Sequence, residues 1–148
     1  ITSQYIPNDL QRLEIYKKIA AIRSSEDYDE LIDELIDRFG DVPRPVMNLM
    51  DISFIRFFAS QCDVQSVMVK GGRMILDFYD EFLGLDFVNS LMFEYRKKIM
   101  YQPPTPKIIY IGETGTLSEW KKFILRLCEL KLSDKERNKK EEEDENEK

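Results

Sequence analysis

The spacing of apolar residues changes near Asp63, and this change constrains the fold more than any other feature of the sequence. Before it, apolar residues recur every three or four positions, which is the period of an amphipathic α-helix. After it come short apolar runs, and two of them, residues 67–69 and 74–78, flank Gly71 and Gly72. A glycine pair between two such runs indicates a tight β-hairpin, because both glycines can adopt positive φ. The sequence therefore predicts an α+β fold, with helices first and strands later.

Two amphipathic helices are predicted at the start of the chain. The first begins at Asn8 or Asp9, residue types that cap free amides at a helix start. Its expected apolar stripe is Leu10, Leu13, Tyr16, Ile19 and Ala20. The second is capped by Ser25 or Asp27 and ends at Gly40. Its expected apolar stripe is Tyr28, Leu31, Ile32, Leu35, Ile36 and Phe39.

The remaining elements complete the predicted fold. A third helix begins near Arg44 and is apolar on two sides, so we expect it at the centre of an N-terminal three-helix cluster. After the hairpin, the pattern predicts a helix over residues 87–99, a short strand at Tyr101, a strand over 108–111 and a last helix from Leu117. The prediction is thus a three-helix cluster followed by a small, mainly antiparallel sheet with two packing helices.

The domain organisation follows from where apolar residues stop. Residues 1–132 are predicted to form a single domain, and residues 133–148 a charged tail. Positions 135–148 hold no apolar residue, so we expect a frayed continuation of the last helix or disorder. The chain starts at Ile1, and we expect it to be a piece of a longer protein. No apolar run approaches the roughly 18 residues of a membrane span, and we expect a cytoplasmic protein.

The residue inventory limits the chemistry. Histidine is absent, so a serine–histidine or cysteine–histidine nucleophile cannot be built from this chain. The two cysteines, Cys62 and Cys128, form no CxxC motif, and we expect two buried thiols in a reducing compartment. These observations predict no catalytic residue, no bound metal and no cofactor site in this domain.

A glycine-containing segment, Gly112–Thr116, lies between a predicted strand and a predicted helix. Phosphate-binding loops occupy this position because helix-start amides bind anions. However, the segment lacks the lysine of a P-loop and the GxGxxG spacing of a dinucleotide loop. The favoured interpretation is a plain turn, and an enzyme site for a phosphorylated ligand is the less favoured one.

The charge balance bears on possible partners. The net charge is −6, whereas a domain that binds duplex DNA usually presents a basic face. The basic clusters, residues 17–18, 96–98 and 121–122, are short and fall at polar helix positions. An acidic surface favours a basic partner surface. A nucleic-acid-contacting accessory domain nevertheless stays an alternative interpretation.

The second predicted helix carries an acidic face. Glu34, Asp37 and Arg38 lie at positions i, i+3 and i+4, so they form one surface patch, with Asp33 and Glu30 on the same face. This patch is either a solvated helix face or a polar docking surface. Composition alone favours the solvated face.

The same helix carries a family resemblance. The segment 34–40, ELIDRFG, resembles the most specific motif in the C-terminal domain of bacterial transcription-repair coupling factor. Weaker motifs follow in the order of that family, and they are Tyr5-Ile6-Pro7, Gln11-Arg12-Leu13, Tyr16–Ala20, Asn48–Ile52, Lys70-Gly71-Gly72, Pro106-Lys107-Ile108 and Glu119-Trp120. The resemblance covers roughly residues 5–130. One departure is Asn8, where the family has an acid directly after Ile-Pro.

The resemblance implies a regulatory role within a larger protein. In that family, the parent contains a module similar to the excinuclease B subunit (UvrB), a module that binds RNA polymerase, and an ATP- and Mg-dependent DNA translocase. The C-terminal domain is not the motor. It packs on the N-terminal UvrB-like module and covers the surface needed by the excinuclease A subunit (UvrA), until polymerase or DNA rearranges the protein. Carried onto this chain, the resemblance implies a contact surface that includes Glu34, Asp37 and Arg38.

Overall fold

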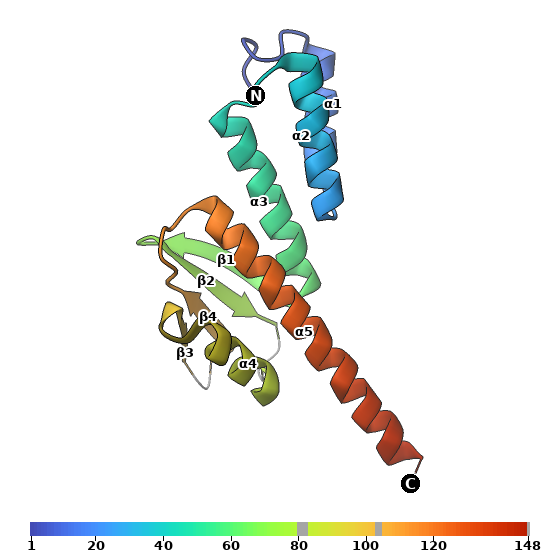
Figure 1. The fold of residues 1–148 in the computed structure, drawn as a ribbon, viewed down its shortest axis with the longest axis vertical. Coiled ribbons are helices and arrows are strands. Elements are labelled where there is room, and N and C mark those ends of the chain that lie inside the picture. The colour runs from blue at the N-terminus through green and yellow to red at the C-terminus, as the bar shows by residue number, and fades with distance from the viewer. Residues whose placement is uncertain (80–82, 103–104, 148) are drawn as a thin grey trace. The chain divides into compact units, whose positions relative to one another are not determined.

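The structure is a computed structural model that describes residues 1–79, 83–102 and 105–147, in two compact units (Figure 1). The first unit is Ile1–Phe57 and the second is Phe58–Lys148. Helix α3 crosses the boundary, because it begins in the first unit and ends in the second.

The first unit contains α1 (Asp9–Ala20), α2 (Ser25–Phe39) and most of α3 (Arg44–Gln61). The side chain of Asn8 caps α1, as predicted, by accepting a hydrogen bond from the amide of Gln11 at 3.0 Å. The prediction for α2 was wrong by one residue, because Ser24 is the cap and accepts from the amide of Asp27 at 3.0 Å. The carboxylate of Asp27 instead accepts from the amide of Arg23 at 2.9 Å, which fixes the turn before the helix.

The apolar stripe predicted for α1 was largely wrong. Leu10 is 78% exposed and Leu13 is 51% exposed, whereas α1 buries Ile15 and Ile19. Apolar residues occur all around this short helix, so its periodicity fits two stripes equally well. The stripe that contains Ile15 and Ile19 is buried because it continues into Ile22, in the turn that leads to α2. Along α2, Tyr28, Leu31 and Leu35 are buried as predicted, whereas Ile36 is half-exposed.

The second unit contains a four-stranded antiparallel sheet of order β1-β2-β4-β3. Its elements are β1 (Val64–Lys70), β2 (Arg73–Phe78), α4 (Leu85–Tyr95), the short 3₁₀ helix η1 (Arg96–Lys98), β3 (Ile99–Tyr101), β4 (Lys107–Tyr110) and α5 (Leu117–Asn146). Gly71 and Gly72 have φ values of 60° and 74° and connect β1 to β2, so the predicted hairpin is confirmed. The α+β fold, with three helices followed by a sheet and two helices, is also confirmed.

Helices α4 and α5 lie on the same face of the sheet (Figure 1). The ring of Phe123 in α5 stacks on Tyr110 of β4, with centroids 4.0 Å apart, and Phe87 in α4 meets Phe78 of β2 edge-on. Strand residues on this face, such as Met74 and Leu76, are buried. The core of the second unit therefore lies between one sheet face and two helices. The charged tail continues α5 as far as Asn146.

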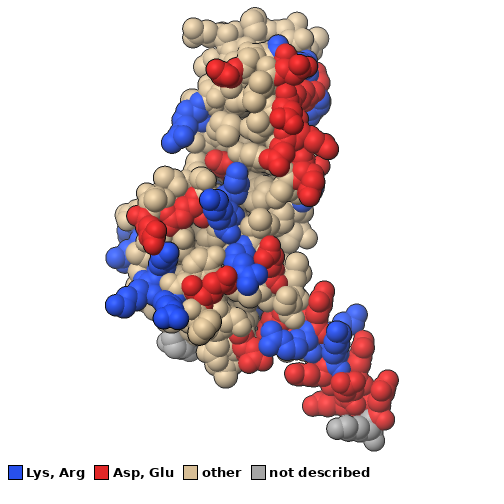
Figure 2. Space-filling model, in the orientation of Figure 1, with Lys and Arg blue, Asp and Glu red and all other residues tan. Residues whose placement is uncertain are grey.

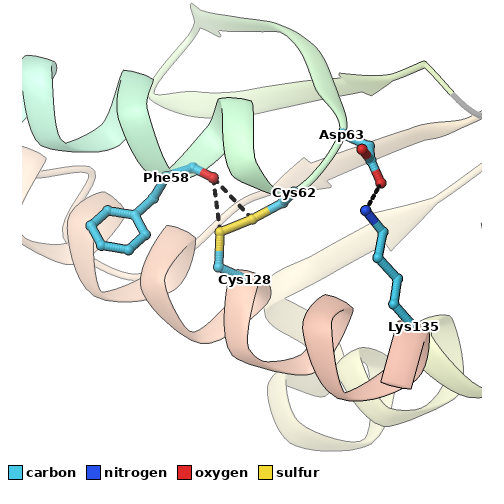
Figure 3. The surroundings of a disulfide bond; sticks show 5 residues. All are labelled: Phe58, Cys62, Asp63, Cys128 and Lys135. Atoms are coloured by element: carbon cyan, nitrogen blue, oxygen red, sulfur yellow. Dashed lines mark hydrogen bonds and ion pairs between the residues drawn. A yellow bond between two sulfur atoms is a disulfide. The ribbon is translucent and has the colours of Figure 1, made fainter. Parts of the chain in front are cut away.

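A disulfide joins Cys62, just after α3, to Cys128 in the middle of α5 (Figure 3). The two Cα atoms are 5.3 Å apart, and both residues are buried. The sequence-based expectation of two thiols was therefore wrong, because the fold brings segments 66 residues apart into contact. Both sulfur atoms contact the carbonyl oxygen of Phe58, and an ion pair of 2.5 Å between Lys135 and Asp63 ties α5 to the start of β1.

Candidate docking site on α1 and α2

The acidic face of α2 is directed away from the core of the first unit. While Tyr28, Leu31 and Leu35 are buried, Glu30, Asp33 and Asp37 are exposed. Acidic side chains gather over the α1–α2 pair in the view of Figure 2. The two faces are distinct because the apolar residues recur every three or four positions and so lie on one side of the helix. The acidic residues recur with the same spacing on the opposite side.

Four side chains of α1 and α2 form an ion-pair network, which consists of Glu14, Lys18, Glu34 and Arg38. The ammonium of Lys18 lies 2.5 Å from the carboxylate of Glu34 and 3.2 Å from that of Glu14. The guanidinium of Arg38 lies 3.3 Å from Glu34 and 3.4 Å from Glu14. Each carboxylate thus meets both cations, and the network holds Glu34 and Arg38 in place at the surface.

The network favours the charged forms of Lys18 and Glu14. The hydrogen bond to Glu34 is the largest of the effects that raise the pKa of Lys18, and the hydrogen bond from Lys18 is the largest of those that lower the pKa of Glu14. Both groups are therefore ionised at neutral pH. The network has two positive and two negative members, so the excess negative charge of this face comes from the exposed carboxylates around it.

The structure relates the five predicted site residues to one another. Glu34 and Arg38 are in the network, and Glu30 lines a depression of about 430 Å³ beside it. The depression is lined by Lys18, Ala21, Asp27, Glu30, Leu31 and Glu34. Asp33 and Asp37 are exposed at the i+3 positions from Glu30 and Glu34 on the same helix. Sequence reasoning missed Glu14 and Lys18, because their place depends on how α1 packs on α2 and no pattern within α1 reports it.

The loop Gly112–Thr116 holds a carboxylate of its own chain. One oxygen of Glu119 accepts hydrogen bonds from the amide of Glu113 at 2.7 Å and the hydroxyl of Tyr110 at 2.9 Å. The other accepts from the amide of Thr114 at 2.6 Å and from the Thr114 hydroxyl. The amides that a phosphate would need are thus already used, which supports the plain-turn interpretation.

Among the residues that the structure describes, no group of three or more Cys, Asp or Glu side chains is arranged to hold a metal ion. No helix in the described part of the chain combines the length and the apolar character needed to cross a membrane.

The fold and the charged surface define the class of the protein, a small α+β domain with a polar surface on a helix pair. The TRCF domain family matches residues 1–82, which is more than half of the chain, and the chain belongs to this family. The match includes α1, α2, α3 and the β1–β2 hairpin.

Known structures and relatives agree with this assignment. A crystal structure of the C-terminal domain of transcription-repair coupling factor superposes with a TM-score of 0.72 at 27% identity, covering 90% of this chain and 88% of the other. Transcription-repair-coupling factors of Staphylococcus epidermidis (strain ATCC 35984) and Staphylococcus aureus (strain USA300) are 37% identical over 71 residues and 39% identical over 74 residues. Each match covers 48% of this chain and 6% of the relative's length.

Proposed function

We propose that this chain is a regulatory domain of a transcription-repair coupling factor and acts as an intramolecular clasp. In this proposal, the α1–α2 surface binds a basic surface on the N-terminal UvrB-like module and masks the site for UvrA. Engagement of RNA polymerase and DNA by other modules opens the clasp. The domain itself is not catalytic, and ATP and Mg act in the motor modules of a cytoplasmic parent protein.

The Glu14–Lys18–Glu34–Arg38 network is the observation that carries this proposal. A docking residue contributes more to the binding free energy when its side chain is fixed before binding, because less conformational entropy is then lost. Glu34 and Arg38 are held in this way while still partly exposed, with 30% and 29% of their side-chain surface accessible. The exposed acids beside them, Glu30, Asp33 and Asp37, add the negative charge that attracts a basic partner.

A polar surface also suits a clasp that must open. Contacts between domains of one chain are commonly polar, and a covalent linker raises the effective concentration of the partner to about the millimolar range. A weak contact is therefore sufficient to keep the clasp closed, and a competing ligand can release it.

The test is binding of this domain to the separately produced N-terminal UvrB-like module of the same protein. We expect binding that UvrA displaces, and we expect the triple variant E34A/D37A/R38A to weaken it at least about tenfold, since several charged contacts are lost together. The control is R137A/E143A/D144A in the tail, which changes the net charge by the same amount and should bind normally. Equal binding by both triple variants would contradict the proposal.

A second candidate function, nucleic-acid contact, has one specific observation in its favour. Phe93 on α4 is 76% exposed, and the guanidinium of Arg96 lies 5.5 Å from its ring centroid, next to Lys97. An exposed aromatic ring beside cations is a feature of single-strand binding surfaces. The two candidates differ in location, because nucleic acid would use the Arg96–Lys98 segment and the clasp would use α1 and α2.

A further inference from the structure

Strand β1 forms one edge of the sheet, and the usual protection of an edge strand is confined to its two ends, at the irregularity near Val64 and at Lys70. Natural edge strands carry charges, prolines or bulges that prevent pairing with another chain. Residues 64–69 carry no charge and no proline, and the one irregularity in the pairing with β2 lies between Val64 and Ser66. The following segment is apolar and open to solvent, with Met68 54% exposed and Val69 51% exposed.

The backbone of this segment presents hydrogen-bonding groups outward. The amide of Phe78 in β2 donates to the carbonyl of Pro106 at 2.9 Å, so alternate residues of β2 face β4 and the others face β1. With Met68 opposite Ile75 and Lys70 opposite Arg73, the backbone groups of Met68 and Lys70 bond to β2. The N–H and C=O groups of Val67 and Val69 therefore point to the free edge.

We propose that this edge binds a second copy of the same chain, through antiparallel pairing of β1 with β1 centred on Met68. Val67 of each copy then exchanges hydrogen bonds with Val69 of the other, which uses all the outward backbone groups of the apolar segment. The two Met68 side chains meet at the centre of the pair, and valine faces valine on either side. Such a self-matching patch is what a two-fold symmetric interface requires.

The charges around the segment favour a second copy. In this pairing Lys70 lies opposite Ser66 of the second copy, whose hydroxyl bonds to Asp77 on the neighbouring strand at 3.2 Å. Each Lys70 ammonium thus approaches the other copy's Asp77 carboxylate, while the two Lys70 residues stay about 13 Å apart, four strand residues. The interface therefore brings opposite charges together and separates like charges.

The pairing also extends an apolar row across the sheet. Met68, Ile75, Ile109 and Met100 are aligned by the strand register, on the face opposite α4 and α5. Two sheets joined at Met68 continue this row across eight strands. The same symmetry would place the second copy's α4 and α5 on the same side as those of the first.

The first measurement is sedimentation of the 148-residue chain over a range of concentrations. We expect a monomer–dimer equilibrium and expect V69P to raise its dissociation constant at least about tenfold, because two symmetry-related hydrogen bonds are lost. Proline at this position leaves the bonds to β2 intact, since the Val69 amide faces the free edge. The matched control V69T keeps the amide and the branched side chain and should dimerise normally. A chain that stays monomeric throughout would overturn the proposal.

Cross-linking tests the register. Under mild oxidation, M68C should give a covalent dimer, because the paired Cα atoms would be about 4.5 Å apart, within reach of a disulfide. S66C should not, because the corresponding atoms would be about 13 Å apart. The native cysteines do not interfere, since they are bonded to each other. Equal cross-linking of the two variants, or none by M68C, would overturn this pairing.

Discussion

At the residue scale, the Glu119 carboxylate occupies the position that a phosphate group would need in the loop Gly112–Thr116. Desolvation by burial raises its pKa, but the hydrogen bonds from the Thr114 side chain, the amides of Glu113 and Thr114 and the Tyr110 hydroxyl outweigh this effect and lower the pKa to about 2. Sequence reasoning found the loop and excluded the known phosphate motifs. It did not find Glu119, because a carboxylate that turns back from a helix onto the preceding loop has no distinctive spacing.

This low pKa predicts a pH-dependent contribution to stability. Because the pKa in the folded chain lies below the ordinary value of 4.5, the contribution is complete above about pH 5 and is lost as pH falls toward 2. We expect E119Q to lower the free energy of unfolding at pH 7 by about 1 kcal/mol, after allowance for solvent screening. The variant should also lose less stability between pH 5 and pH 2 than the natural chain.

Urea unfolding over that pH range measures the effect. E113Q is the control, because its side chain belongs to the same loop but pairs with Lys98 at 2.7 Å outside the Glu119 contacts. Parallel pH profiles for E119Q and the natural chain would show that the Glu119 contacts do not contribute to stability.

At the element scale, the helices and strands differ in how much of them the sequence determines. The C-terminal end of α2 could be predicted because Gly40, with a φ of 83°, ends the helix, whereas the predicted caps Ser25 and Asp27 were wrong because Ser24 is the cap. The inward face of α1 could not be predicted from the sequence, because the apolar residues of this helix are distributed around it. The hairpin could be predicted because Gly71 and Gly72 leave few alternatives.

The ion-pair network between α1 and α2 should contribute little to stability. Its members are partly exposed, and pairs of this kind contribute about 0 to 1 kcal/mol each. We therefore expect E34A/D37A/R38A to unfold at nearly the same urea concentration as the natural chain, with a loss of less than about 1.5 kcal/mol. Circular dichroism during urea unfolding measures this. A much larger loss would mean that the network holds the helix pair together, and reduced binding of the variant would then reflect unfolding.

At the scale of the whole molecule, the chain divides into two units, and the division was not evident from sequence. The prediction of a single domain over residues 1–132 was based on the occurrence of apolar residues throughout that range. This domain assignment stays a prediction. The disulfide lies wholly within the second unit, since both cysteines follow Phe57. Its effect should therefore be confined to that unit.

Hydrogen exchange with and without reductant tests this confinement. A disulfide that spans 66 residues stabilises a fold by about 4 kcal/mol in the chain-entropy description. We expect reduction to increase amide exchange in β1, β2, β4 and α5, and to leave α1 and α2 almost unchanged. The double variant C62S/C128S should show no response to reductant. Equal loss of protection in both units would mean that they unfold together.

The position of the disulfide also determines what happens when the chain is cut. The bond closes a covalent ring that runs from Cys62 to Cys128 and includes all four strands. A protease that hydrolyses one peptide bond anywhere inside this ring leaves a single molecule, which retains its mass apart from one added water. Only a reductant separates the fragments on a gel. Cleavage before Cys62 or after Cys128 releases a fragment at once, so the two kinds of nick can be told apart without locating the cut.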